Sequence, residues 1–314
     1  MSAIKVHLCP SVGESQLPIL LRLLTQADSA DEIVLDLERV RWWMPGAVLA
    51  VFSRVQFWLR EKRKIQLLNY QACEAFRYLQ RIDFFEQLGI KIPEDFHRHD
   101  ATGRFLPIRQ VGFSSGGLGK IATELAQCVV PGADWNDDTY KLVQYVAGEI
   151  LGNAVQHSGG VAWVSAQYFP KGGLVRVAVA DNGGGILESF KGTPLHNPEM
   201  TDEDAVKKAS EPGVSSGKYR RPLYGRPHNR GLGLSVVDDL VRQSLGYMQI
   251  VSMAGWRSRN MDNVQTALRP EANHPGTLVC AAFQRDQIHR YQEMHQVALK
   301  TLGLRLDVPD DIFR

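Results

Sequence analysis

Three short motifs between residues 149 and 234 constrain the fold of the chain most strongly. They read EILGNAVQHS at 149–158, DNGGGI at 181–186 and NRGLGL at 229–234. The first lies within an expected helix, the second directly follows an expected strand, and the third opens another helix. The stretch from 183 to 230 contains many Gly, Pro and Ser residues and is expected to be a long loop. This order of elements predicts an α/β domain whose motifs meet at one site.

The first motif places three polar side chains on one face of a helix expected from Asp137 to His157. Glu149, Asn153 and His157 are spaced four residues apart. The neighbouring stripe, which would bury the helix, consists of Val146, Ile150 and Ala154. A carboxylate, an amide and an imidazole on one face suit a base, an oxygen ligand for a metal and a donor to phosphate. A solvated polar face would show the same spacing.

The second motif follows a strand expected over 174–180. Its inward face consists of Val175, Val177 and Val179. Strand alternation puts Asp181 on that same face, where a buried carboxylate needs a hydrogen-bond donor. The exocyclic amine of adenine can supply one, and the glycines at 183–185 allow a sharp turn beneath a flat base. A simple tight turn at the end of a strand is the alternative.

The third motif opens a helix expected from Gly233 to Leu245. Glycine-bearing backbone at a helix N-terminus offers amide donors and a positive dipole end to phosphate oxygens. The preceding loop carries a basic cluster made of Lys218, Arg220, Arg221, Arg226, His228 and Arg230. These side chains either are solvated or close over a γ-phosphate as a clamp.

Together the motifs resemble the N box and the two glycine boxes of the GHKL superfamily, the ATP-binding domain of histidine kinases, anti-sigma-factor kinases, gyrase and heat-shock chaperones. The resemblance covers residues 105–283. It implies an α/β sandwich, with a mixed sheet and helices on one face, that binds ATP and Mg²⁺. Asn229 stands where many members have another glycine, so closure of the loop is expected to differ.

By this resemblance Glu149 is the general base, Asn153 the magnesium ligand and Asp181 the adenine contact. Gly183 and Gly185 shape the base pocket. The remaining implied nucleotide-binding residues are His157, Ile186, Gly231, Leu232, Gly233 and Thr277, with Gly276 beside the last of these.

The first ninety residues alternate short apolar strands with amphipathic helices, which predicts a small α/β domain over 1–92. The strand ending at Leu37, the turn at Pro45 and the strand Ile65–Leu68 resemble a STAS domain of anti-sigma-factor antagonists. Phosphorylatable members carry a hydroxyl residue in that turn, whereas this chain has Trp-Met-Pro-Gly at 43–46. The resemblance implies a domain that docks a protein partner and accepts no phosphate. An unrelated small α/β domain is the alternative.

The rest of the chain divides into an expected linker over 93–104, the ATP-binding domain over 105–284 and a helical tail over 285–314. In the tail, apolar residues recur at helical spacing, so it could pack on the domain or on a partner. Two domains, each with its own core, suit a chain of 314 residues.

The amino-acid composition limits the classes of partner that we expect the protein to bind. The net charge is +2, from 36 basic and 34 acidic residues, which argues against nucleic acid or anionic lipid as a partner. The four cysteines form no CxxC pair, and there is no secretory signal or run of 18 apolar residues, so we expect a cytoplasmic protein without a membrane span. A homodimer is compatible with the sequence.

The sequence therefore predicts a regulatory protein that binds magnesium ATP. The leading hypothesis is an ATPase or a serine/protein kinase resembling anti-sigma-factor kinases. The rival is a switch that binds ATP without hydrolysing it and presents a surface to a protein partner. No helix pair carrying a phosphoacceptor histidine is evident before the N box, which disfavours a sensor histidine kinase.

Overall fold

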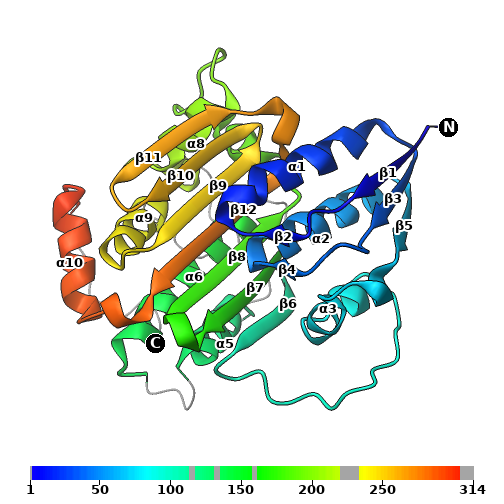
Figure 1. The fold of residues 1–314 in the computed structure, drawn as a ribbon. Coiled ribbons are helices and arrows are strands. Elements are labelled where there is room, and N and C mark those ends of the chain that lie inside the picture. The colour runs from blue at the N-terminus through cyan, green and yellow to red at the C-terminus, as the bar shows by residue number, and fades with distance from the viewer. Residues whose placement is uncertain (1, 113–116, 131–134, 158–160, 220–232, 305–314) are drawn as a thin grey trace.

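The structure is a computed structural model that describes residues 2–112, 117–130, 135–157, 161–219 and 233–304. Residues 2–92 form a parallel α/β unit (Figure 1). Its sheet has the order β1-β3-β5, and helices connect its strands, as parallel pairing requires. The main elements are β1 (Ala3–His7), α1 (Leu17–Gln26), β3 (Glu32–Asp36), α2 (Pro45–Arg60) and β5 (Lys64–Leu68). The short ones are β2 (Ser11–Val12), β4 (Trp42–Trp43), α3 (Phe76–Arg81) and α4 (Phe84–Gln87). The predicted α/β pattern is confirmed.

Helix α2 is buried on nearly every side, without a gap from Pro45 to Val55. Pro45 occupies the first turn, where its missing N–H leaves no hydrogen bond unmade. A helix that is apolar around its circumference must be covered on all faces. Helix α1 and strand β5 cover one side, and strands of the C-terminal sheet cover the other.

That second sheet has seven strands in the order β11-β10-β9-β12-β8-β7-β6. The strands are β6 (Phe105–Gly112), β7 (Val161–Phe169), β8 (Leu174–Asp181), β9 (Tyr247–Met253), β10 (Gly255–Asn260), β11 (Asn263–Leu268) and β12 (His274–Gln284). Every pairing among these described strands is antiparallel, so the expectation of a mixed sheet is wrong. Short connections such as the one between β7 and β8 produce antiparallel neighbours. Strands β6, β10 and β11 were not predicted.

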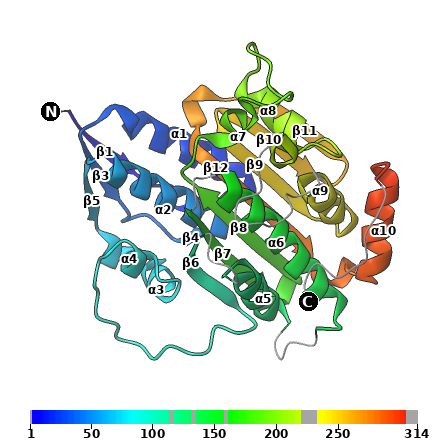
Figure 2. The ribbon, with the colours of Figure 1, turned by 180° about the vertical axis from the view of Figure 1, so that it is seen from behind.

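One face of this sheet carries the helices of the predicted sandwich (Figure 2). They are α5 (Gly117–Val129), α6 (Asp138–His157), α7 (Gly185–Phe190), α8 (Asp202–Ala209), α9 (Gly233–Gln243) and α10 (Tyr291–Thr301). Asp137 caps α6, because its Oδ1 accepts a hydrogen bond from the Tyr140 amide at 3.0 Å. The predicted stripe Val146, Ile150 and Ala154 lies in the core beneath α6.

The other face of the sheet packs against helix α2 of the N-terminal region (Figure 1). Phe52 of α2 and Trp163 of β7 meet edge to face, with ring centroids 5.6 Å apart. One continuous apolar cluster joins the N-terminal region to this face of β7, β8, β9 and β12. The sheet face opposite its own helices is therefore apolar and is covered by α2. A second apolar cluster, between the sheet and its helices, lies entirely within residues 106–299, so only the first is shared with the N-terminal region. The predicted domain bounds stay a prediction.

The connection over 93–104 contains no helix or strand, as expected for a linker. It is nevertheless tied to the N-terminal region, since Arg98 pairs with Asp83 at 2.5 Å. At the other end, α10 packs on α9 and α6, and Met294 and Ala298 are buried. The tail helix thus packs on its own domain.

The long loop predicted over 183–230 is helical in part. Helix α7 begins inside the DNGGGI motif, and α8 carries a capping box in which the Thr201 hydroxyl accepts from the Asp204 amide at 3.2 Å. Residues 220–232 lie outside the described part of the chain. Among the described residues, no helix is long and apolar enough to cross a membrane.

Candidate functional site

A pocket lies between the sheet and helices α6, α7 and α9. Five of the predicted site residues line it: Asn153, Asp181, Ile186, Gly233 and Thr277. The walls also include apolar side chains such as Val179 and Ile250, together with Ser189, Ser215 and Ser216, which the sequence analysis did not identify.

Glu149 stands one helical turn before Asn153, at the end of the pocket where α9 begins. An added Cβ on Gly233 would lie 2.5 Å from Glu149 Oε2 and 3.4 Å from Asn153 Nδ2. A larger residue at the start of α9 would therefore have to displace the Glu149 carboxyl group from its present position. Oε2 of Glu149 is buried and has no hydrogen-bond partner among the described residues. Burial raises the pKa of Glu149 to about 7, which suits a general base at neutral pH.

Asn153 presents an amide to the pocket and could supply an oxygen to a metal ion. Among the described residues, no group of three or more His, Cys, Asp or Glu side chains could hold a metal. Mg²⁺ usually keeps several waters and binds substrate phosphates, and an amide oxygen such as that of Asn153 is a ligand type that it accepts.

Asp181 ends strand β8 and is only 2% exposed. Its Oδ1 accepts a hydrogen bond from the Gly183 amide at 2.8 Å, while burial raises its pKa to about 7. Gly276 has φ +84°, and an added Cβ there would lie 2.3 Å from the Asp181 carbonyl oxygen. The irregularity near the start of β12, between His274 and Thr277, thus brings backbone against Asp181 and holds its carboxyl group in the pocket wall.

Two further predicted site residues, Ile186 and Thr277, are joined through Ser252 of β9. Its hydroxyl accepts from the Ile186 amide at 2.8 Å and lies 3.1 Å from the Thr277 hydroxyl. Gly185 has φ +76°, and an added Cβ would overlap Ser252 Oγ at 2.9 Å. Sequence reasoning missed Ser252, because a lone serine in an apolar strand carries no recognisable signature.

The structure thus brings together Glu149, Asn153, Asp181, Gly183, Gly185, Ile186, Gly233, Gly276 and Thr277. The other predicted residues lie outside the described part of the chain: Gly231, Leu232 and the loop arginines Arg220, Arg221, Arg226 and Arg230. The side chains of His157 and Lys218 are likewise not described, although His157 ends α6. Their roles stay predictions.

Comparison with protein families agrees with this geometry. Residues 138–280 match the family described as histidine kinase-, DNA gyrase B- and HSP90-like ATPases. This segment is therefore similar to the ATPase domain of the GHKL type. The match begins at the first residue of α6 and ends within β12, so it contains all the residues that line the pocket. It supports ATP binding by the domain. Comparison with the curated proteins finds no match for this chain.

Proposed function

We propose that the protein binds magnesium ATP in this pocket and is a nucleotide-dependent regulatory ATPase or serine/protein kinase, similar to anti-sigma-factor kinases. The observation that carries the proposal is Glu149: a buried carboxyl oxygen without a partner among the described residues, beside the start of a helix. A buried group of this kind costs stability unless a ligand or a reaction uses it.

The residues have separate tasks. Asp181 accepts a hydrogen bond from the adenine amine, and the apolar walls hold the base. Asn153 would hold Mg²⁺ together with the phosphates, and when bound the ion neutralises charge on the β- and γ-phosphates. The N-terminus of α9 points amide donors at the phosphates.

Glu149 acts on the attacking group. It accepts a proton from water or from a serine hydroxyl as that oxygen bonds to the γ-phosphorus and the bond to the ADP oxygen breaks. Its pKa of about 7 lets it hold and release this proton near neutral pH.

The N-terminal region is proposed to be a STAS-like module that receives a protein partner. Its turn at Trp43–Gly46 is buried, and an added Cβ on Gly46 would lie 2.4 Å from Cys280 Sγ of β12. This turn therefore offers neither a hydroxyl to phosphorylate nor an accessible surface. A partner would contact the outer side of the region, where Ile19 and Leu59 are exposed.

Turnover and binding of two variants test the proposal. Glu149→Gln keeps the shape of the side chain and should bind magnesium ATP while losing turnover by about 10²- to 10⁴-fold. Asn153→Ala should weaken magnesium ATP binding itself. Glu293→Gln, an exposed carboxylate on α10, serves as the control and should behave like the parent.

The rival function, an ATP-dependent switch without hydrolysis, predicts a different result in the same experiment. If the parent binds ATP but transfers no phosphate under any partner condition, or if Glu149→Gln turns over ATP as fast as the parent, the enzyme proposal is wrong and the switch stands.

A further inference from the structure

Helix α2 of the N-terminal region contacts the backbone segment that carries Asp181. The Asn182 side chain donates to the Ser53 carbonyl oxygen at 2.8 Å. Arg60 Nη1 donates to the Asn182 carbonyl oxygen at 3.0 Å. Asn182 is 8% exposed, so both bonds are formed at a largely buried position. The residue next to the proposed adenine contact is thus held by two groups of α2.

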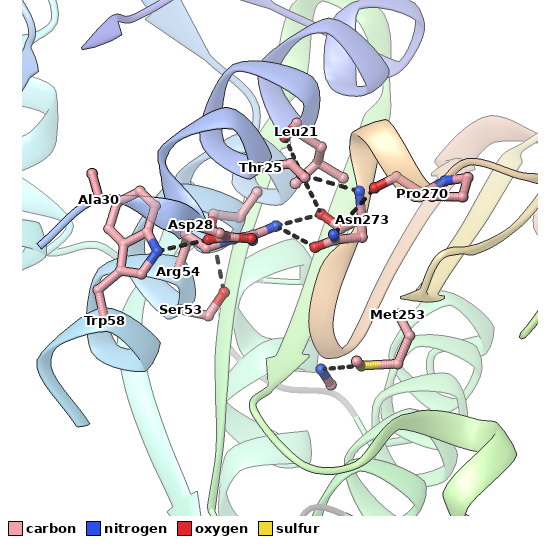
Figure 3. A network of polar contacts seen from close by, with 12 residues as sticks. Leu21, Thr25, Asp28, Ala30, Ser53, Arg54, Trp58, Met253, Pro270 and Asn273 are labelled. Atoms are coloured by element: carbon pink, nitrogen blue, oxygen red, sulfur yellow. Dashed lines mark hydrogen bonds and ion pairs between the residues drawn. The ribbon is translucent and has the colours of Figure 1, made fainter. Parts of the chain in front are cut away.

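The same helix also holds the segment that leads into β12 (Figure 3). Arg54 is fully buried and pairs with Asp28 at 2.5 Å. Its other guanidinium nitrogen donates to the Asn273 backbone carbonyl and, at 3.1 Å, to Asn273 Oδ1. The Asn273 amide in turn donates to the Thr25 hydroxyl of α1 at 3.1 Å.

These two segments form one wall of the pocket. Asn273 stands three residues before Gly276, whose α-carbon faces the Asp181 carbonyl, and β12 pairs with β8 directly beyond this point. A shift of α2 along its axis would therefore move both Asp181 and Thr277. The pocket is also lined by Asn153 of the N box and by Gly233 of α9.

We propose that helix α2 positions the adenine side of the nucleotide pocket, with Arg60 and the Ser53 carbonyl acting through Asn182. Arg60 is a positioning residue that sets selectivity for the base and does not touch the nucleotide. The inference rests on the proposed ATP binding. Because coupling is reciprocal, a partner that displaces α2 changes ATP affinity, and ATP changes the affinity for that partner by the same factor.

Arg60 permits a clean test because its side chain is exposed, so its loss leaves the core intact. ATP and GTP affinities should be measured by calorimetry for Arg60→Ala, Arg60→Lys and a control. In Arg60→Ala the Kd for ATP should rise about three- to tenfold, the value of one hydrogen bond, while the Kd for GTP stays unchanged. Arg60→Lys keeps a donor and should recover most of the selectivity.

Arg41→Ala is the matched control. Arg41 is an exposed arginine of the same region whose side chain pairs with the exposed Glu74, and neither residue lines the pocket. It should keep the ATP to GTP ratio of the parent. A merely structural effect of Arg60→Ala would weaken both nucleotides equally, and that result would overturn the inference.

The outcomes separate the two proposals. If the parent protein binds no ATP, the proposed function itself is wrong. If the parent prefers ATP and Arg60→Ala shows the same preference, ATP binding stands and only the role of α2 is wrong. Loss of preference in Arg60→Ala with recovery in Arg60→Lys supports the role of α2.

Discussion

Replacing Gly276 with alanine tests whether the close approach of β12 to Asp181 fixes the pocket wall. At φ +84° an L-residue is strained by about 1–2 kcal/mol. The new Cβ would lie 2.3 Å from the Asp181 carbonyl oxygen, about 1 Å short of the ordinary contact distance of 3.4 Å. Overlap with backbone adds about 1–3 kcal/mol. Gly276→Ala should therefore lower the free energy of unfolding by about 2–5 kcal/mol.

The same displacement moves the Asp181 carboxyl group, so affinity for ATP should fall about tenfold or more, the value of a lost hydrogen bond. Urea denaturation followed by tryptophan fluorescence measures the stability, and calorimetry measures the affinity. Gly173→Ala is the control, because Gly173 has φ +61° but its nearest atom beyond the turn is 3.7 Å away. The free energy of unfolding of Gly173→Ala should therefore fall only by the cost of the backbone strain. The reasoning is refuted if Gly276→Ala costs no more stability than Gly173→Ala, or if it binds ATP like the parent.

Three more outcomes are expected. Gly233→Ala puts a Cβ 2.5 Å from Glu149 Oε2 and so moves the proposed base by about 1 Å. This shift should lower ATP turnover on the order of 10²-fold. Unchanged turnover would contradict the placement of the base. The pKa of Asp181 is about 7 in the ligand-free folded state and 3.8 for an ordinary aspartate. Between these values the folded state keeps a proton that the unfolded state has lost. The free energy of unfolding therefore falls as the pH rises from about 4 to 7. Asp181→Asn should make this slope less negative by up to ~1.4 kcal/mol per pH unit in denaturant titrations, and an unaltered slope would exclude the raised pKa. Asp28→Ala leaves the fully buried Arg54 without its carboxylate and should cost about 3–5 kcal/mol of unfolding free energy, whereas a loss below about 1 kcal/mol would show that the pair is not buried in solution.

The sequence predicted the local parts of the site well, because each motif is short and lies on one element. The spacing of Glu149 and Asn153 fixed their common helix face, and strand alternation placed Asp181 inward, as the structure confirms. The strands expected to end at Leu37 and to span Ile65–Leu68 agree with β3 and β5 to within one residue, because the apolar periodicity there is regular.

What the sequence could not predict depends on contacts between distant segments. The burial of α2 against β7, β8 and β12 joins residues more than a hundred positions apart, and no pattern in either segment names the other. Strands β10 and β11 were missed because they carry many polar residues, with Asn263–Gln265 exposed at the sheet edge. Helices α7 and α8 were missed because the glycines and prolines around them favoured a loop.

The central claim, that the pocket binds ATP through Asp181, is tested most directly by calorimetric titration of the parent and of Asp181→Ala with ATP and GTP. We expect the parent to bind ATP more tightly than GTP and the variant to lose this preference, because the substitution removes the pocket carboxyl group proposed to accept a hydrogen bond from the adenine amine. If Asp181→Ala binds ATP as tightly and as selectively as the parent, the assignment of this pocket to the adenine base is wrong.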